Sequence, residues 1–325
     1  MRSFAALFAA FIVTCLCAGA PRAQDAASWP NQPVRMVVPF PAGGPADIVA
    51  RMVSERLSQV WGQGVVVENK PGANTAIAAA QVAKAPANGY TLLVVMDVTM
   101  VLNPLTSKTM SYDPIRDFDP ISLLAKNTSF LTVHVDGPKT LAELIAKGRA
   151  NPGKLNFGAG IITTRLAAEL FNKEMGIVAQ YVPFQGSPPT VQALLSKSVD
   201  YIVDGQAASL PLIQSGLFRA LAKTNEGPVP ALPELRSLAV EAGAPALDDV
   251  STWIGVVAPA GTPRAIIDKV QREIARAYDD PVLVDRIRKA GLNPVGATPE
   301  SFAKFIQSET KRWDKVVKES GIELN

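Results

Sequence analysis

The chain is poor in the residues that most catalytic and metal sites use. Among 325 residues it has two cysteines, Cys15 and Cys17, and a single histidine, His134. His134 alternates with valines in a stretch typical of a strand, where a structural role is far more common than catalysis. A Ser-His-Asp triad or a His-rich metal site would depend on it alone, and there is no Walker A loop, nucleophile elbow or HExxH motif. These absences argue against an enzyme, and we expect neither a metal nor a cofactor.

Long apolar runs are also missing, except at the N-terminus. The stretch from Phe4 to Cys17 is apolar apart from Thr14, follows Arg2 and precedes a region of small residues. It is too short to span a bilayer, and its pattern is typical of a secretory signal peptide, which we predict over residues 1–24. We therefore expect an exported protein without stable insertion in a membrane.

The chain also has no large excess of charge of one sign, because it contains 32 basic and 29 acidic residues. Removal of Arg2 and Arg22 with the signal peptide would leave 30 basic residues and a net charge near +1. Such a balance gives no reason to expect nucleic acid or an anionic membrane surface as a partner. Both cysteines lie in the predicted signal peptide, so the mature chain would depend on packing and not on disulfides.

What the sequence does contain is an alternation of short β-branched runs with segments of helical periodicity. Strands are predicted at 34–38, 65–68, 91–96, 131–135, 154–157, 180–182, 199–203 and 253–258. Helices are predicted at 45–60, 73–83, 141–150, 163–174, 190–196, 263–278, 281–290 and 299–320. This order predicts an α/β fold with parallel sheets covered on both faces.

The two series of strands predict two lobes, each a mainly parallel sheet flanked by helices, with a ligand cleft between them. The last three helices have few strands of their own, so we expect them to return to the first lobe. Lobe 1 is predicted at 29–127 and 253–325, and lobe 2 at 128–252. The chain would then cross near 125–130 and near 249–253, and a double crossing makes a hinge.

The loop at 39–47 follows the first strand and leads directly into a helix. Gly43 and Gly44 have no Cβ to keep a ligand away from the free N–H groups of the helix start, which favour an anion. The loop at 158–165, GAGIITTR, repeats this arrangement in the second series. Two helix starts that face one cleft would hold a carboxylate from both sides.

Asp97 and Asp204 each follow a predicted strand, and either could accept hydrogen bonds from a ligand or cap a loop. Asp47 lies in the first helical turn, where a carboxylate commonly satisfies backbone donors, so a structural role and a ligand contact remain open. Arg165 could pair with Glu169 one turn later or neutralise a ligand carboxylate.

The positions of three large aromatic side chains also remain open. Phe40, Phe184 and Trp253 could form walls of the cleft or belong to the core, and the core is the more common place for such residues.

The sequence resembles the Bug family of periplasmic solute-binding proteins. The resemblance is carried, in order, by PFPAGGPADIVAR, VVVENKPGAN, NGYTLL, YDPIRDFDPIS, NPGKLNFG, LAAELF, VPFQG, GLFRALAKT and WIGVVAPAGTP. It implies a two-lobed receptor of the type II-like periplasmic-binding-protein fold that closes around a small organic carboxylate. It also implies delivery of that ligand to the small and large membrane subunits of a tripartite tricarboxylate transporter, without ATP.

The family's binding loops fall on Phe40, Ala42, Gly43 and Asp47, and on the loop at 158–165. Together with the loops chosen from the residues, the expected ligand-binding set is Phe40, Ala42, Gly43, Gly44, Asp47, Asp97, Gly158, Gly160, Thr163, Thr164, Arg165, Phe184 and Asp204.

The sequence departs from the family in this same region. Arg165 stands where the family usually has histidine, and Gln185 stands where it usually has lysine. Arg165 offers a bidentate partner for a second carboxylate, so a dicarboxylate or hydroxy-acid is the first choice of ligand, with an aromatic acid as another carboxylate candidate. If Asp97 and Asp204 both face the cleft, their charge favours an amino acid instead.

Two other functions remain open at this point. An extracytoplasmic sensor of this kind would contact a membrane histidine kinase in place of a permease. An exported enzyme with the same two lobes would need a catalytic set, and the sequence shows none.

Overall fold

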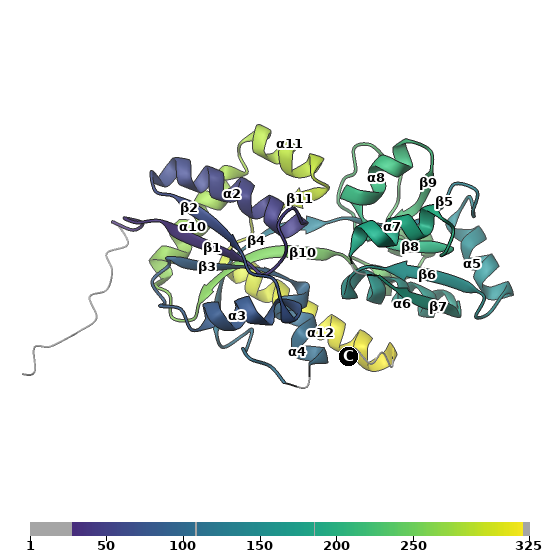
Figure 1. The fold of residues 1–325 in the computed structure, drawn as a ribbon, viewed down its shortest axis with the longest axis horizontal. Helices are drawn as coiled ribbons and strands as arrows, with labels where there is room; N and C mark the ends of the chain where they lie inside the picture. Colours follow the sequence, from purple (N-terminus) through teal and green to yellow (C-terminus); the bar gives the residue numbers. More distant parts are fainter. Residues whose placement is uncertain (1–27, 108, 185, 321–325) are drawn as a thin grey trace, which may run out of the picture.

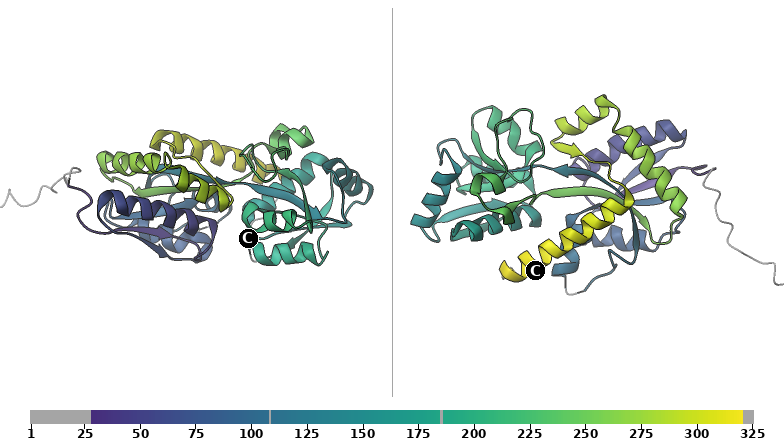
Figure 2. Two further views of the ribbon diagram at one scale, coloured as in Figure 1. Left: turned by 90° about the horizontal axis from the view of Figure 1, so that it is seen from above. Right: turned by 180° about the vertical axis from the view of Figure 1, so that it is seen from behind.

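Two α/β lobes lie side by side in the computed structural model, which describes residues 28–107, 109–184 and 186–320 (Figures 1 and 2). Each lobe has one sheet with helices on both faces. We call the lobe around the six-stranded sheet lobe 1 and the lobe around the five-stranded sheet lobe 2. The predicted signal peptide, 1–24, lies outside the described residues.

The sheet of lobe 1 has the order β11-β4-β10-β3-β1-β2 among the described residues. Its strands are β1 (Val34–Val38), β2 (Val65–Asn69), β3 (Thr91–Met96), β4 (Phe118–Asn127), β10 (Thr252–Pro259) and β11 (Leu292–Pro294). One face packs on α2 (Pro45–Trp61), α10 (Arg264–Ala277) and α11 (Pro281–Lys289). The other packs on α3 (Ala76–Ala83), α4 (Asn103–Thr106) and α12 (Pro299–Ser320).

The sheet of lobe 2 has the order β7-β6-β8-β5-β9 among the described residues. Its strands are β5 (Ser129–His134), β6 (Leu155–Ala159), β7 (Ala179–Pro183), β8 (Tyr201–Gly205) and β9 (Phe218–Lys223). Its helices are α5 (Leu141–Ala150), α6 (Ile162–Met175), α7 (Ser187–Leu195), α8 (Gln206–Gln214) and α9 (Leu238–Ala242), with a 3-10 turn, η4 (Pro245–Leu247).

The sheets are mixed, whereas the sequence predicted mainly parallel ones. Pairs β1–β2, β1–β3, β6–β7 and β6–β8 are parallel, but β4 and β10 pair antiparallel with each other. β4 ends at Asn127 and β5 begins in the other sheet at Ser129, so this strand leaves lobe 1 as β10 returns to it. Neighbouring strands that leave and return must run in opposite directions. The predicted lobe boundaries remain a prediction.

Several elements differ from their predicted positions. The helix expected at 73–83 begins at Ala76, because a 3-10 turn, η2 (Ala73–Thr75), precedes it with three residues of positive φ. β4, β9, β11, α8 and α9 were not expected. Helix α8 contains Pro211, a residue that is unfavourable inside a helix. The C-terminal helices do cover lobe 1, as expected.

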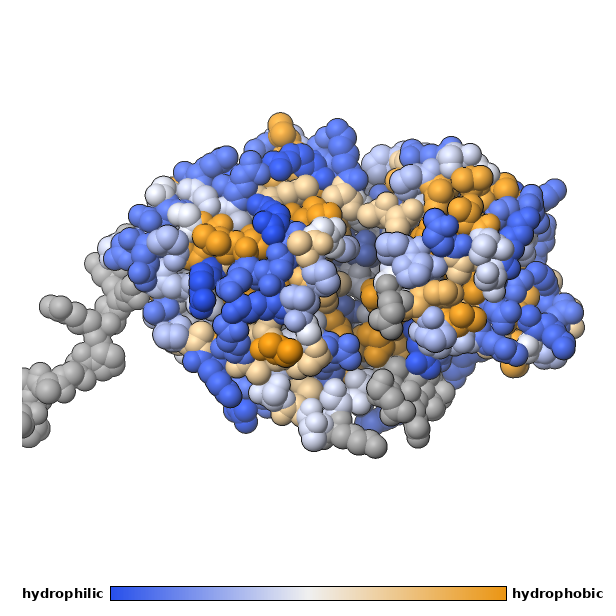
Figure 3. All heavy atoms as spheres, in the orientation of Figure 1, coloured by the Kyte–Doolittle hydropathy of each residue, from blue (hydrophilic) through white to orange (hydrophobic). Residues whose placement is uncertain are grey.

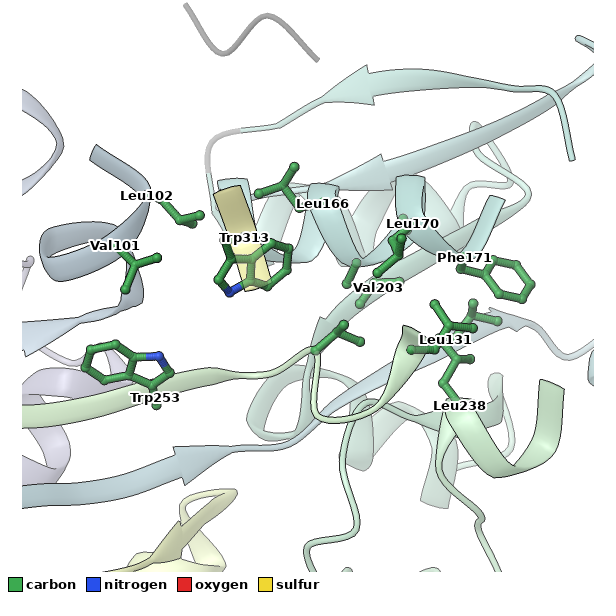
Figure 4. Packing of buried hydrophobic residues seen from close by; sticks show 14 of the residues in the cluster. Val101, Leu102, Leu131, Leu166, Leu170, Phe171, Val203, Leu238, Trp253 and Trp313 are labelled. Carbon is green, nitrogen blue, oxygen red and sulfur yellow. The ribbon is translucent and has the colours of Figure 1, made fainter. Parts of the chain in front are cut away.

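One apolar cluster extends through both lobes on the α12 side of the sheets. It contains Leu93 and Val95 of β3, Phe171 of α6, Trp253 of β10 and Trp313 of α12, all buried. Helix α12 accordingly contacts β4 in lobe 1 and α6 in lobe 2 (Figures 1 and 4). Trp253 is therefore a core residue, the more common of its two interpretations.

The packing of α12 on β10 can be tested at Gly255. A Cβ added there would lie 2.2 Å from Cζ of Phe302, a fully buried ring on α12. Because a buried ring cannot turn aside cheaply, we expect Gly255→Ala to lower the free energy of unfolding by about 1–3 kcal/mol in urea titrations. Gly64→Ala is the control, since no atom lies within 4 Å of its added Cβ. Equal stability of the two variants would contradict this packing.

Candidate functional site

The first loop of the site connects β1 to α2. Gly43 has a φ of +82°, which glycine adopts readily, and Gly44 is the residue that precedes the helix. Ala42 and Gly43 are exposed, whereas Phe40 is half-buried against the core of lobe 1. No side chain among the described residues caps α2, so the first turn of this helix keeps N–H groups for an anion.

Asp47 holds this loop in shape. Its Oδ2 accepts hydrogen bonds from the N–H of Gly43 at 2.9 Å and from Nε of Arg51 at 3.0 Å. Its Oδ1 accepts one from Nδ2 of Asn69 at 2.9 Å. Burial opposes ionisation of Asp47, but these donors together outweigh it and lower the pKa of the carboxyl below its usual value. Asp47 therefore acts through the loop, and a direct contact with a ligand stays a prediction.

The second loop connects β6 to α6 and packs against the end of β7. The N–H of Gly186 donates to the carbonyl of Gly160 at 3.0 Å, and a Cβ on Gly160 would lie 2.3 Å from the carbonyl oxygen of Gly186. Gly158 approaches the ring of Phe184 closely, since its Cβ would lie 3.0 Å from that ring. Two chain segments thus meet at a distance that only glycine at 160 permits.

The first turn of α6 carries two hydroxyl residues and a cation. Oγ1 of Thr164 donates to the carbonyl of Ile161 at 3.0 Å, within the loop. Arg165 donates from Nε to Glu169 at 2.6 Å and lies over the ring of Tyr181, 4.4 Å from its centroid. The pair with Glu169 that the sequence left open is therefore present. The ring and the carboxylate both contact the guanidinium and hold it in place.

Asp97 directly follows β3 and joins the two lobes. It is 1% exposed, and its Oδ2 accepts a hydrogen bond from Oγ1 of Thr163 on α6, itself 2% exposed. Burial raises the pKa of Asp97 to about 7. The hydrogen bond from Thr163 lowers this pKa in part, and the nearby charge of Glu309 raises it.

Asp204 lies at the end of β8 and is bonded within lobe 2. Its carboxylate accepts hydrogen bonds from the hydroxyl of Ser187 on α7 and, at 3.4 Å, from that of Ser209 on α8. Burial raises its pKa to about 7. Asp204 thus connects three elements of one lobe, and its contact with a ligand remains a prediction.

These loops come together because of the strand order. The neighbouring strands β1 and β3 are parallel, as are β6, β7 and β8, so each group ends at one edge of its sheet. The bond between Asp97 and Thr163 brings the start of α6 to the edge of lobe 1. Ligands of open α/β sheets bind beyond such edges. Figure 3 shows a recess between the lobes.

The sequence missed one more loop at this edge, which follows β2. Ala73, Asn74 and Thr75 have φ values of 45°, 47° and 78°, and Nδ2 of Asn103 holds the carbonyl of Asn74 at 2.5 Å. Positive φ in three consecutive residues other than glycine is strained and is typical of functional sites. The signal was the Pro-Gly pair of KPGANT, which the helical spacing after it concealed.

The family follows from a comparison with known proteins. The model of the tripartite tricarboxylate transporter family receptor, TctC, matches residues 49–322. The chain belongs to this receptor family. Its members are receptors and not enzymes, as the sequence predicted, and the resemblance to the Bug family is confirmed by protein BugT of Bordetella pertussis. BugT is 34% identical, and the match covers 100% of this chain and 99% of BugT.

Two solved structures share the two-lobed fold. Rpa4515 of R. palustris with adipate is 35% identical, with a TM-score of 0.80, and the match covers 90% of this chain and 99% of that one. MatC of Rhodopseudomonas palustris with bound malate is 31% identical, with a TM-score of 0.75. The match covers 89% of this chain and 100% of the MatC chain. The α/β two-lobed fold predicted from the sequence is thereby confirmed.

Two further observations concern membranes and metals. Among the described residues, no helix has the length and apolar character needed to cross a membrane. Within the same part of the receptor, no group of three or more His, Cys, Asp or Glu side chains is placed to hold a metal ion.

The role of Asp47 in the loop gives a pH-dependent prediction. Because its pKa is lowered in the folded receptor, its stabilising contribution is present above the usual pKa of about 4 and is lost as pH falls through the folded value. We expect Asp47→Asn to cost about 1–2 kcal/mol of unfolding free energy at pH 7 and less as pH falls below about 4.

The matched control is Asp285→Asn, which removes an exposed pair of the same spacing with Lys289. Exposed pairs contribute little, so this variant should stay near the wild type. Urea titrations at pH 7 and pH 3 measure both, and a cost for Asp47→Asn that does not change with pH would contradict the role of its charge.

Proposed function

We propose that this receptor captures a small dicarboxylate or hydroxy-acid between its lobes in the periplasm. It then delivers the ligand to the small and large membrane subunits of a tripartite tricarboxylate-type transporter. The observation that carries the proposal is the hydrogen bond between Asp97, at the end of β3 in lobe 1, and Thr163, at the start of α6 in lobe 2. It joins the edges of the two sheets at which the strand-to-helix loops lie. A ligand that touches loops of both lobes would stabilise the lobes in contact.

Backbone donors supply the site for the first carboxylate. Neither α2, which begins after Gly44, nor α6, which begins after Ile161, has a side-chain cap among the described residues. The first N–H groups of each helix carry partial positive charge and lack partners within the helix. An anion between the two starts would satisfy donors of both lobes at once.

Arg165 supplies a cation for the second carboxylate. Its Nε donates to Glu169, and its guanidinium carbon lies 4.4 Å from the centroid of the Tyr181 ring, so two contacts hold the guanidinium in place. A planar guanidinium binds a carboxylate in bidentate fashion. The adipate of Rpa4515 and the malate of MatC are both dicarboxylates, which supports the same class of ligand here.

A thermal-shift screen tests the proposal. The panel contains adipate, malate, succinate, benzoate, glutamate and glucose, with the mature receptor at pH 7. A ligand at a hundredfold excess over its dissociation constant stabilises by about 2.7 kcal/mol, so a dicarboxylate should raise Tm clearly while glucose does not. A folded receptor that responds to no carboxylate in the panel would overturn the proposal.

The role of Arg165 is testable by substitution. We expect Arg165→Ala to weaken dicarboxylate binding about 10- to 100-fold in calorimetry, because a charge-assisted bidentate contact is lost. Binding of the matched monocarboxylate should change little. Arg264→Ala removes an arginine with the same spacing to its acidic partner, Asp268, on α10, and serves as the control. Unchanged dicarboxylate affinity in Arg165→Ala would remove the argument for a second anion.

A further inference from the structure

Within the described residues, a hydrogen bond between buried side chains connects the edges of the two lobes at which the candidate binding loops lie. Asp97 stands where β3 ends in lobe 1, and Thr163 is in the first turn of α6 in lobe 2. Oγ1 of Thr163 donates to Oδ2 of Asp97, 66 residues away in the chain. Both side chains are almost completely buried, so water can enter only if the lobes separate.

An apolar contact accompanies this bond. Trp313 of α12 is fully buried and lies between Leu102, which follows β3 in a π-helical turn (η3, Val98–Leu102), and Leu166 of α6 (Figure 4). Nε1 of Trp313 donates to Oε2 of Glu309 at 3.3 Å, which orients the indole. The polar bond and the apolar contact therefore join the same two segments, the end of β3 and the start of α6.

We propose that Asp97 and Thr163 are positioning residues, whose hydrogen bond sets the start of α6 opposite the loop after β1 when the lobes come together. The sequence placed both residues among the ligand contacts, whereas the geometry gives each the other as its partner. This inference rests on the proposed function, because it concerns the same cleft. It adds that part of the closing free energy comes from the receptor itself.

The contact also couples closure to a proton. Burial raises the pKa of Asp97 to about 7 in this structure, and separation of the lobes would hydrate the carboxyl and return its pKa towards 3.8. Thr163 of α6 and Glu309 of α12 are the groups that act on it from the packed helices. The lobes in contact therefore bind the extra proton. The ratio of contacting to separated lobes is therefore highest below about pH 4. It falls about tenfold per pH unit as the pH rises from there to about 7.

Small-angle scattering of the ligand-free receptor at pH 5 and pH 8 tests this. We expect the wild type to be more compact at pH 5. Asp97→Asn keeps an oxygen that accepts from Thr163 but carries no charge, so it should be equally compact at both pH values. Thr163→Val loses the hydroxyl but keeps the shape, so its ratio of contacting to separated lobes should fall about tenfold at both.

Thr190→Val is the matched control. Thr190 is fully buried in the first turn of α7, and its hydroxyl donates to the carbonyl of Gly186 inside lobe 2. This variant should lose stability in urea but keep the dimensions and the pH profile of the wild type. If Thr163→Val has the dimensions of Thr190→Val and the pH profile of Asp97→Asn matches the wild type, the positioning role is overturned.

Ligand binding separates this inference from the proposed function. A silent ligand panel together with the expected scattering results would overturn the proposed function and leave the Asp97–Thr163 contact supported. Dicarboxylate binding that is equally tight in wild type, Asp97→Asn and Thr163→Val from pH 5 to pH 8, with unchanged scattering, would overturn only the contact. Weaker binding in Thr163→Val, with the loss of pH dependence in Asp97→Asn, would support both.

Discussion

The burial of two indoles in one apolar cluster fixes how the lobes meet. Trp253 comes from the strand that returns to lobe 1, and Trp313 from the last helix, and both are almost fully buried. Trp253 packs edge-to-face on Phe302 and Phe305, with centroid distances of 5.6 and 5.5 Å, which holds α12 on the sheet. Exposure of even part of an indole costs about 1–3 kcal/mol, so the lobes resist separation on this side.

The resistance of the lobes to separation affects how much free energy a ligand must supply on binding. A ligand need not supply the whole free energy of closure, because packing and the Asp97–Thr163 bond supply part of it. Two of the carboxylates near the loops, Asp47 and Asp204, are already engaged within their own lobes. Asp47 shapes the first loop, and Asp204 connects α7, β8 and α8. We therefore propose that the loops are ordered before the ligand arrives, and that backbone donors and Arg165 carry the recognition.

The sequence was most informative where the signal is local. The Pro-Gly turn before Pro45 and the apolar spacing of Val49, Val53 and Leu57 predicted the loop and the helix α2, because caps and periodicity act over a few residues. β4 was missed, since its sequence FDPISLLAKN contains a proline and polar residues. Its place in the sheet depends on pairing with β10, more than 100 residues later.

At the site, the sequence indicated features of the backbone better than the partners of side chains. Gly43 has a positive φ and Gly160 lies against the carbonyl oxygen of Gly186, whereas their choice as ligand contacts stays a prediction. The partners of Asp97 and Asp204 were not predictable, because both depend on side chains brought together by the folded chain. The strained turn at 73–75 was also missed, since the helical spacing that follows it concealed the Pro-Gly pair before it.

The central claim is that a carboxylate binds between the lobes and stabilises their contact. Because Cys15 and Cys17 are the only cysteines and lie in the predicted signal peptide, spin labels can be placed on Gln59→Cys of α2 and Gln192→Cys of α7, both exposed. The distribution of distances between these labels, measured by electron paramagnetic resonance, should become narrower and shift to shorter values when a dicarboxylate that binds in calorimetry is added. An unchanged distance distribution at saturation would contradict the account.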